Sequence, residues 1–420
     1  MTIESADNNG IGAKWTVEEM LMLYHLKAAN KSHKDISSIM KTKIGRREYS
    51  ENLIQKKWRG TNWIEFLKDQ GEKEDFFKEL TDRENEKHKI IESTLEYQDK
   101  MVRRDQARTD LIIDSIKSSI YRLPKPHKSE SIYKPCKSAK YRSEHMAVLL
   151  SDMHLGSCFT KEDTGGLSEY NIDIAKKRLD TLKNTLLSIL ERHQHVCDIP
   201  ELHVFCLGDI VAGMNGVGSW SSNYIDLDIY DQMMEGMAML RNVIATWSRA
   251  FKKIHFYGVF GNHGRAAKRG VQKDYTNWDK ICYEFVRQSM GEYENIVWNI
   301  PKAWWIQTRI LNHNFYMTHG DGIRGSLGVP YYGVERAERL ILGLMKNDPP
   351  DYMLLGHFHS PAEIQTNSGR IMLNGSFLGG DMYSLRDLRR KDRSEQKMFG
   401  IHDKKGITWS YNIQLDWEDS

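Results

Sequence analysis

The sequence predicts a layered α/β domain that follows a small all-helical domain. From residue 145 onward, short apolar runs alternate with longer runs of helical periodicity, a pattern typical of stacked sheets and helices. Each apolar run ends in a polar cluster. Residues 14–70 instead combine three tryptophans with basic side chains at helical spacing. The chain is therefore expected to join a helical domain to an α/β domain.

Four segments divide the chain on this interpretation. Residues 1–13 are polar and are expected to form a flexible N-terminus, and residues 14–70 form the helical domain. Residues 71–144 are predicted to be a long helix followed by a basic extended linker. Residues 145–420 make up the α/β domain.

The connecting segment has two parts that differ in composition. Residues 72–120 are rich in charged side chains with apolar residues at helical spacing, which predicts one long exposed helix. The apolar spacing would allow two copies to pair over residues 76–118, although polar residues interrupt the heptad pattern that a coiled coil needs. Residues 121–143 carry three prolines and many lysines, which predicts an extended linker.

Strands and helices of the α/β domain follow from the periodicity. The predicted strands are residues 146–150, 202–207, 254–260, 315–318 and 352–355. The predicted helices are residues 174–195, 229–251, 278–289 and 335–347. The first strand is continuously apolar rather than alternating, so we expect it to lie centrally, covered on both faces.

Length and composition narrow the class of protein. A chain of 420 residues with 40% hydrophobic and 28% charged residues can bury two or three cores. Its first residues are polar and acidic, and no window approaches 18 consecutive apolar residues, so we expect no membrane contact and no secretion. An intracellular protein, cytoplasmic or nucleoid-associated, is predicted. Its five cysteines lack C-x-x-C spacing, which argues against a zinc knuckle or a disulfide framework.

The charge is distributed unevenly. Residues 1–144 hold 29 basic and 24 acidic side chains, whereas the remainder holds 31 and 33. Residues 27–59 and 115–143 each carry an excess of seven basic side chains. Such clusters favour a polyanionic partner, and the alternative is a solvated basic face.

The stretch VLLSDMHLG places Asp152 and His154 just beyond the first strand. Residues two apart in an extended chain point the same way, and open α/β sheets bind ligands at the carboxyl ends of their strands. Both side chains are therefore able to reach one metal ion, although a single D-x-H pair more often caps a turn.

Polar clusters of the same kind follow the four other predicted strands. The clusters SDMHLG, LGDIVAG, FGNHGR, THGDG and GHFHSP supply Asp152, His154, Asp209, Asn262, His263, His319, His357 and His359. Because strand ends of a parallel or mixed sheet share one edge, these side chains are expected to converge. Seven ligands of mixed nitrogen and oxygen character, drawn from these eight residues, suffice for two divalent ions. Three histidines within or near strands, His203, His255 and His313, are assigned to packing or surface roles.

The order D-x-H, G-D, G-N-H, H and G-H-x-H resembles the calcineurin-like metallophosphoesterase superfamily, and is similar to its DNA repair exonuclease branch. The likeness spans residues 146–380 and implies a layered β-sandwich flanked by helices, with residues 373–380 as a closing strand. It implies that one metal is held by Asp152, His154, Asp209 and His359. It implies that the other is held by Asp209, Asn262, His319 and His357. Manganese is the first choice, with magnesium, iron or zinc as alternatives.

The resemblance also makes His263 the catalytic histidine that is not a ligand. Two departures from the family pattern accompany it. Gly264 and Arg265 follow the G-N-H motif where an acidic residue is frequent, and GDIVAG lacks the second aspartate and the arginine of many phosphatases. These departures disfavour the protein serine/threonine phosphatase branch.

The front block resembles a Myb/SANT-like helix-turn-helix module. KWTVEEMLMLYHLKAANKSHKDISSIM matches its first two helices and NLIQKKWR its third, with Leu21, Ile36 and Ile39 facing the core and Ile36 replacing one tryptophan. The likeness implies DNA as partner, contacted through Ser50, Asn52, Gln55, Lys56 and Arg59. Some SANT-like modules bind proteins instead, so a protein partner is the alternative.

Basic side chains also follow the predicted metal ligands. Arg265, Lys268, Arg269 and Arg324 are predicted to contact DNA, and Tyr331 and Tyr332 to stack on bases. Together these features predict a two-metal phosphodiesterase, specifically a DNA nuclease recruited by its front module. The alternatives are a small-molecule phosphatase or nucleotide phosphodiesterase, and a catalytically inactive DNA-binding scaffold.

Overall fold

The computed structural model describes residues 15–28, 31–44, 50–69, 74–122, 130–136, 143–214, 224–324 and 331–416. The chain divides into two compact units, Met1–Met101 and Val102–Ser420. The predicted flexible N-terminus lies outside the described ranges. Within those ranges, every helix is either too short or too polar to form a membrane span.

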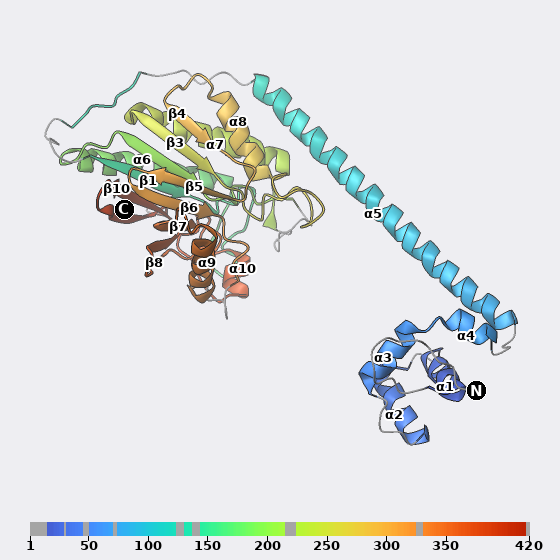
Figure 1. The fold of residues 1–420 in the computed structure, drawn as a ribbon. Helices are drawn as coiled ribbons and strands as arrows, with labels where there is room; N and C mark the ends of the chain where they lie inside the picture. Colours follow the sequence, from blue (N-terminus) through green and yellow to red (C-terminus); the bar gives the residue numbers. More distant parts are fainter. Residues whose placement is uncertain are drawn as a thin grey trace. The chain divides into compact units, whose positions relative to one another are not determined.

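Helices alone make up the described part of the first unit (Figure 1). They are α1 (Val17–Ala28), α2 (His33–Ile44), α3 (Glu51–Gly60), α4 (Trp63–Asp69) and the start of α5 (Glu74–Arg122). Their common core contains Trp15, Met20, Leu23, Ile36, Met40 and Ile54. That this unit is a Myb/SANT-like helix-turn-helix module stays a prediction.

The core of the first unit differs in part from the sequence prediction. Ile36 is fully buried, as expected for the residue that replaces a tryptophan. Leu21 and Ile39 are only half-buried, so their predicted core positions are wrong. The stripe of α1 that faces the core runs through Met20 and Leu23, which lie one turn apart on the same helical face.

The helix α5 confirms the long helix predicted for the connecting segment. Large apolar side chains on it, including Ile90, Ile91 and Leu95, are exposed to solvent. Pairing of two copies through residues 76–118 stays a prediction. Residues 130–136, from the predicted linker, adopt neither helix nor strand.

Two mixed sheets form the centre of the second unit (Figure 1). The first has the order β11-β10-β1-β2-β3-β4, and the second has the order β5-β6-β7-β9-β8. The first comprises β1 (Glu144–Leu150), β2 (Glu201–Cys206), β3 (Lys253–Gly258), β4 (Ile296–Asn299), β10 (Glu395–His402) and β11 (Gly406–Gln414). The second comprises β5 (Trp305–Ile310), β6 (His313–Thr318), β7 (Tyr352–Leu355), β8 (Ala362–Gln365) and β9 (Arg370–Leu373).

Parallel pairing aligns the strand ends that matter for the site. β1, β2 and β3 run parallel to one another, with Val148 beside Val204 and Val204 beside Phe256. β6, β7 and β9 run parallel in the second sheet. The carboxyl ends of the predicted strands therefore share an edge within each sheet.

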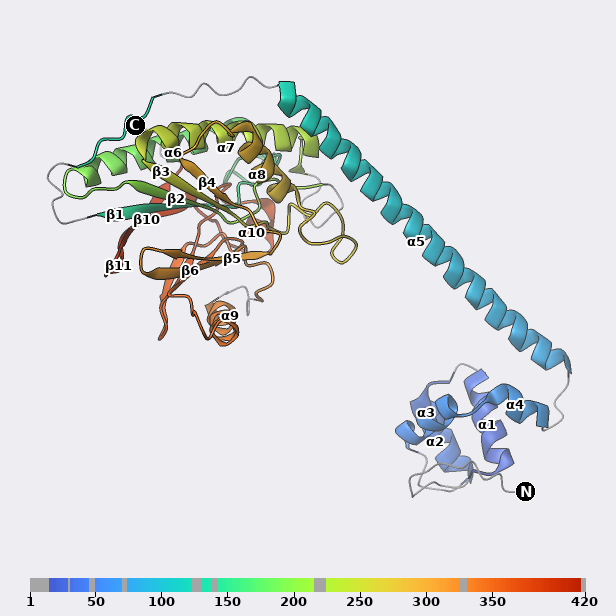
Figure 2. The same cartoon turned by 45° about the horizontal axis from the view of Figure 1, so that its top comes forward.

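The strand β1 is covered on both faces, as its continuous apolar sequence predicts. Met146 and Val148 pack toward the helices α6 (Ile172–Gln194), α7 (Ile229–Ala250) and α8 (Trp278–Ser289). Ala147 and Leu149 belong to a cluster that includes residues of the second sheet such as Phe315. Figure 2 shows the three helices over the first sheet and α9 (Tyr331–Leu344) beside the second sheet.

Several elements differ from the prediction. The predicted closing strand 373–380 is wrong, because β9 ends at Leu373 and the buried amide of Asn374 instead bonds Ser151 Oγ at 2.9 Å. β10 is a buried strand that was not predicted, and its polar residues Gln396 and Lys397 are buried with it. α9 begins earlier than predicted and includes Tyr331 and Tyr332.

Candidate metal centre

The eight predicted site residues converge from five separate loops. The loops follow β1, β2, β3, β6 and β7, at the carboxyl end of each strand. Three sets of ligand atoms each lie within 4.8 Å of one another: Asp152, His154 and His359; His154, Asp209 and His263; and Asp209, His319 and His357. Asn262 joins them, with its Oδ1 3.2 Å from His319 Nε2. Asp209 belongs to two of the three sets.

The backbone at five of these residues is left-handed. Their φ angles are 56° at Asp152, 47° at His154, 54° at Asp209, 68° at His357 and 57° at His359. Among the described residues other than glycine, only Leu311 and Arg389 share this conformation. Each such residue costs on the order of 1 kcal/mol, and such strain concentrates at functional sites. The five residues therefore hold positions that the rest of the fold must enforce.

One half of the site is formed by Asp152, His154 and His359. The two Nε2 atoms lie 3.3 Å apart, and His359 Nε2 lies 3.4 Å from Asp152 Oδ1. Bonds of about 2.0–2.2 Å around a tetrahedral ion place neighbouring ligand atoms roughly 3.3–3.6 Å apart. The Asp152 carboxylate is held in place, because it accepts hydrogen bonds from Ser151 Oγ at 2.5 Å and the His357 N–H at 3.1 Å.

The other half is formed by Asp209, His319 and His357 with Asn262. His319 Nε2 lies 3.0 Å from Asp209 Oδ2. The Nδ1–H of His319 donates to the carbonyl of Leu207 at 2.7 Å, which directs Nε2 toward Asp209 and Asn262. Ligating histidines commonly have an outer partner of this kind, which fixes the ring and its tautomer.

His263 lies beside both halves. Its backbone N–H donates to Asp209 Oδ1 at 2.8 Å, and its ring lies edge-on to that of His154 with centroids 4.3 Å apart. Its Nδ1 lies 3.1 Å from the carbonyl of Ala212, so a proton on Nδ1 leaves Nε2 available. A backbone carbonyl thus orients this ring, in a chain where glycine follows the G-N-H motif instead of an acidic residue.

Burial and charge oppose each other in this cluster. Asp152 is 0% and Asp209 1% exposed, and burial tends to raise the pKa of a carboxyl. The neighbouring histidines outweigh burial, and the pKa of both carboxyls is lowered. Burial likewise tends to lower the pKa of His319 and His359, but Asp209 and Asp152 raise these values to about 10 and about 9.

Two further imidazoles respond differently. Burial lowers the pKa of His154 to about 3 and that of His357 to about 4. The centre therefore combines two buried carboxylates with two neutral imidazoles, His154 and His357, while His319 and His359 favour the protonated form. Buried carboxylates need such a positive partner. Protons on histidine and divalent cations compete for that role.

Asp279 is a functional residue that the sequence interpretation missed. Its fully buried carboxylate accepts backbone N–H groups from Asp209, Ile210 and Gly261, each at 2.9 Å. Burial and the charge of Asp209 raise its pKa to about 6. Asp279 thereby ties the loop after β2 to the loop after β3. An aspartate in the first turn of a helix normally faces solvent, and only the apolar neighbours of α8 could have indicated its burial.

Glycine is required where these two loops meet. A Cβ on Gly208, which has a φ of 92°, would lie 2.5 Å from the backbone nitrogen of Gly261. A Cβ on Gly261 would lie 2.1 Å from Asp209 Oδ1. The backbone of the two loops therefore approaches closely beside the ligands at both positions.

The predicted DNA-contacting residues are placed in two different units. In the second unit, Lys268, Arg269 and Arg324 are exposed. Arg265 is instead only 23% exposed and is paired with Asp321 at 2.5 Å, so its charge is already balanced. Contact with DNA stays a prediction for Arg265, as it does for the three exposed residues.

The other predicted contacts lie on or beside α3 of the first unit. Ser50 caps this helix by accepting the Leu53 N–H at 3.2 Å. Asn52, Lys56 and Arg59 are exposed and recur at helical spacing, whereas Gln55 is half-buried. Contact with DNA stays a prediction for all five.

Comparisons with known proteins provide little beyond this geometry. No protein-family model matches the chain, and no curated protein matches it. Among solved structures, Vps29 from Cryptosporidium parvum is 13% identical with a TM-score of 0.30, covering 65% of this chain and 99% of its own. A novel archaeal phosphodiesterase is 12% identical with a TM-score of 0.28, covering 64% and 99%. A predicted phosphoesterase from Streptococcus pneumoniae is 10% identical with a TM-score of 0.26, covering 65% and 99%.

Proposed function

We propose that this protein is a calcineurin-like phosphodiesterase with two divalent metal ions, and that its substrate is DNA. The observation that supports this most strongly is the convergence of five loops, with Asp209 shared between two ligand sets and five ligand residues in left-handed backbone. The motif order in the sequence resembles the same superfamily. Packing alone does not account for the concentration of left-handed backbone in the polar residues of these loops.

The donor atoms fit divalent ions. Two carboxylates, one amide and four imidazoles form a mixed nitrogen and oxygen set, which suits manganese and also iron, magnesium or zinc. Asp152, His154, Asp209 and His359 would hold one ion. Asp209, Asn262, His319 and His357 would hold the other. Bound there, such ions supply neutralisation of phosphate charge and a water molecule of lowered pKa.

The chain's own residues position this chemistry. Asp279 fixes the backbone of Asp209 and Gly261, and Leu207 fixes the ring of His319. In its imidazolium form, with Nδ1–H bonded to the Ala212 carbonyl, His263 can pass the Nε2 proton to the leaving oxygen of the ester. A protonated leaving group departs more readily, so this histidine is the proposed general acid.

DNA is proposed as substrate because of the first unit. Residues 27–59 carry ten basic and three acidic side chains, and Lys56 and Arg59 lie exposed on one helix. Basic helices of this kind bind the phosphate backbone, and a tethered binding unit raises the local concentration of substrate. Such a substrate would also place the protein in the cytoplasm or at the nucleoid.

A parallel assay of the full chain tests this proposal. Plasmid, single-stranded DNA, bis-p-nitrophenyl phosphate and p-nitrophenyl phosphate are incubated with manganese and each variant. We expect hydrolysis of DNA and of the diester, loss of both in Asp209→Asn, and retention of DNA binding in a gel-shift assay. Hydrolysis of small esters alone would support the phosphatase alternative, and DNA binding without any turnover would support the scaffold. In Lys56→Ala/Arg59→Ala, DNA affinity should fall while diester hydrolysis persists.

A further inference from the structure

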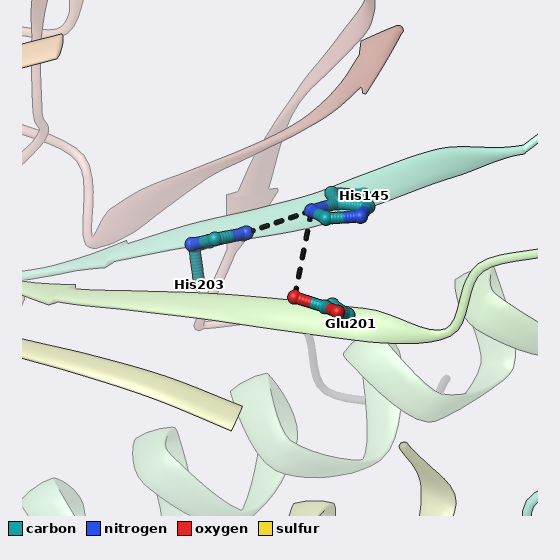
Figure 3. Close-up of side chains that lie close together, drawn as sticks. All are labelled: His145, Glu201 and His203. Carbon is teal, nitrogen blue, oxygen red and sulfur yellow. Dashed lines mark hydrogen bonds and ion pairs between the residues drawn. The ribbon is translucent and has the colours of Figure 1, made fainter. Parts of the chain in front are cut away.

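A second cluster of histidines and a carboxylate lies at the opposite ends of the same strands. His145 is the second residue of β1, Glu201 and His203 are the first and third of β2, and His255 is the third of β3. The metal centre lies beyond the carboxyl ends of these strands, whereas this cluster lies at their amino ends. Figure 3 shows His145, Glu201 and His203 directed toward one another from the adjacent strands β1 and β2.

The pairing register explains why these side chains meet. His203 pairs with Ala147 of β1 and with His255 of β3, and Glu201 precedes His203 by two residues on the same face. That face also carries Phe205 and packs toward the second sheet. The cluster therefore closes the amino-terminal end of the layer between the sheets.

The distances within this cluster are compatible with a metal site. His145 Nδ1 lies 3.0 Å from His203 Nε2 and 3.8 Å from Glu201 Oε2, and the three ligand atoms all lie within 4.8 Å of one another. Ligand atoms around a tetrahedral ion lie roughly 3.3–3.6 Å apart, a spacing that these two distances bracket. Small side-chain shifts suffice to place all three at bonding distance.

Outer partners orient two of the three ligands. His203 Nδ1 lies 3.3 Å from the hydroxyl of Tyr257, which leaves Nε2 to face His145. Glu201 Oε2 lies 2.7 Å from His255 Nε2. A ring that bonds an outer partner through one nitrogen and faces the cluster through the other is the usual arrangement of a ligating histidine.

The environment also favours a cation. His203 is 3% exposed, while the side chain of Glu201 is 27% exposed and leaves a route for an ion. Burial lowers the pKa of His145 and of His203, which favours neutral rings. One of the two facing nitrogens donates to the other, and a change of tautomer frees its lone pair for a metal ion. The half-buried Glu201 supplies the negative charge.

We infer that His145, Glu201 and His203 bind one zinc ion, with His255 as the outer partner of Glu201. Two imidazoles and a carboxylate are typical zinc ligands, and three protein ligands leave a fourth position for water. The ion cross-links β1 and β2 at the edge remote from the metal centre and stabilises the amino-terminal end of the sheet. It requires no catalytic activity from the protein.

Zinc content of the full chain tests this inference. Each variant is loaded with zinc, desalted and measured by mass spectrometry of the metal, with circular dichroism as the check on folding. We expect Glu201→Gln and His145→Gln each to hold about one zinc ion fewer per chain than the unaltered protein. His313→Gln is the matched control, because His313 lies at the start of β6 and bonds the carbonyl of His402 instead.

Both variants change partly exposed side chains, and Glu201→Gln is nearly isosteric, so each should remain folded. Anomalous diffraction from a zinc-soaked crystal gives an independent result. We expect a peak between His145, Glu201 and His203, and we expect it to vanish in Glu201→Gln. Equal zinc content in the variants and no peak at this position would show a hydrogen-bonded histidine cluster only, and would overturn the inference. Because peaks at the metal centre are recorded separately, failure there is distinguishable from failure here.

Discussion

The two ends of β1, β2 and β3 carry the same residue types in opposite structural settings. At the carboxyl ends, Asp152 and Asp209 lie in loops, with left-handed backbone and no exposure of consequence. At the amino ends, His145, Glu201 and His203 lie within regular strands, and Glu201 is partly exposed. Left-handed backbone in the loop residues lowers the stability of the fold, whereas the regular strand backbone at the amino ends carries no such cost. On the two proposals above, the carboxyl ends serve chemistry and the amino ends serve stabilisation.

The largest expected effect separates the two ends of one strand, β6. His319 follows the strand and faces Asp209, whereas His313 begins it and bonds a backbone carbonyl. We expect His319→Ala to lower the rate of diester hydrolysis by more than about a hundredfold, because changes even to outer partners of metal ligands cost about 10–100-fold. His313→Gln should retain the rate. Steady-state kinetics with manganese measures both, and similar losses would contradict the assignment of roles.

The next effect concerns Asp279, which acts through the backbone of Asp209. Asn in its place keeps the shape but offers one acceptor oxygen instead of two, so backbone N–H groups of the two loops lose partners. We expect Asp279→Asn to reduce manganese affinity and activity by about 10–100-fold. Isothermal titration and kinetics measure this.

Asp173→Asn is the matched control for Asp279, because Asp173 also lies in the first turn of a helix but is exposed. It should change the free energy of unfolding by less than about 1 kcal/mol and leave metal affinity as it was. Equal metal affinities in the two variants would refute the positioning role of Asp279.

How much of this comparison the sequence could predict depends on where each residue lies. The loop residues were predictable because Asp152, Asp209 and His319 come directly after apolar strands, where their polarity has no packing explanation. His145 and His203 lie inside strands, and nothing in one sequence aligns them across β1 and β2. Their grouping became visible only from the pairing register.

Long-range partners escaped prediction for a related reason. Gln396 accepts the Ser151 N–H at 2.9 Å and donates to the carbonyl of Gly375, so it is buried by contacts with residues remote in sequence. A glutamine gives no local sign of such burial, and the strand β10 was not predicted. Local patterns predict elements and loop clusters, whereas buried polar networks depend on the assembled sheet.

A smaller effect tests the close contact between the loops of the metal centre. A methyl group on Gly261 would overlap Asp209 Oδ1, so Gly261→Ala should lower the free energy of unfolding by about 1–3 kcal/mol and weaken activity. Gly343→Ala is the control, because a Cβ in that last turn of α9 meets nothing within 4 Å. Urea denaturation compares the two. A stable, active Gly261→Ala protein would show that the loops have room to separate.

The smallest expected effect concerns His193, in the last turn of α6. Burial lowers the pKa of His193 below its ordinary value of 6.5, and its ring stacks on Trp409 with centroids 4.3 Å apart. Because the folded protein favours the neutral ring, this contribution to stability is fully present above about pH 6.5 and is lost as the pH falls. The unfolding temperatures of the unaltered protein and of His193→Gln are compared at pH 8, 7, 6 and 5. They should differ most at high pH and become equal at low pH. Partial exposure keeps the difference below about 1 kcal/mol. His195→Gln, two residues away and exposed, is the control and should follow the unaltered protein. If the unfolding temperatures of His193→Gln and of the unaltered protein instead changed in parallel with pH, His193 would not contribute to the pH dependence of stability.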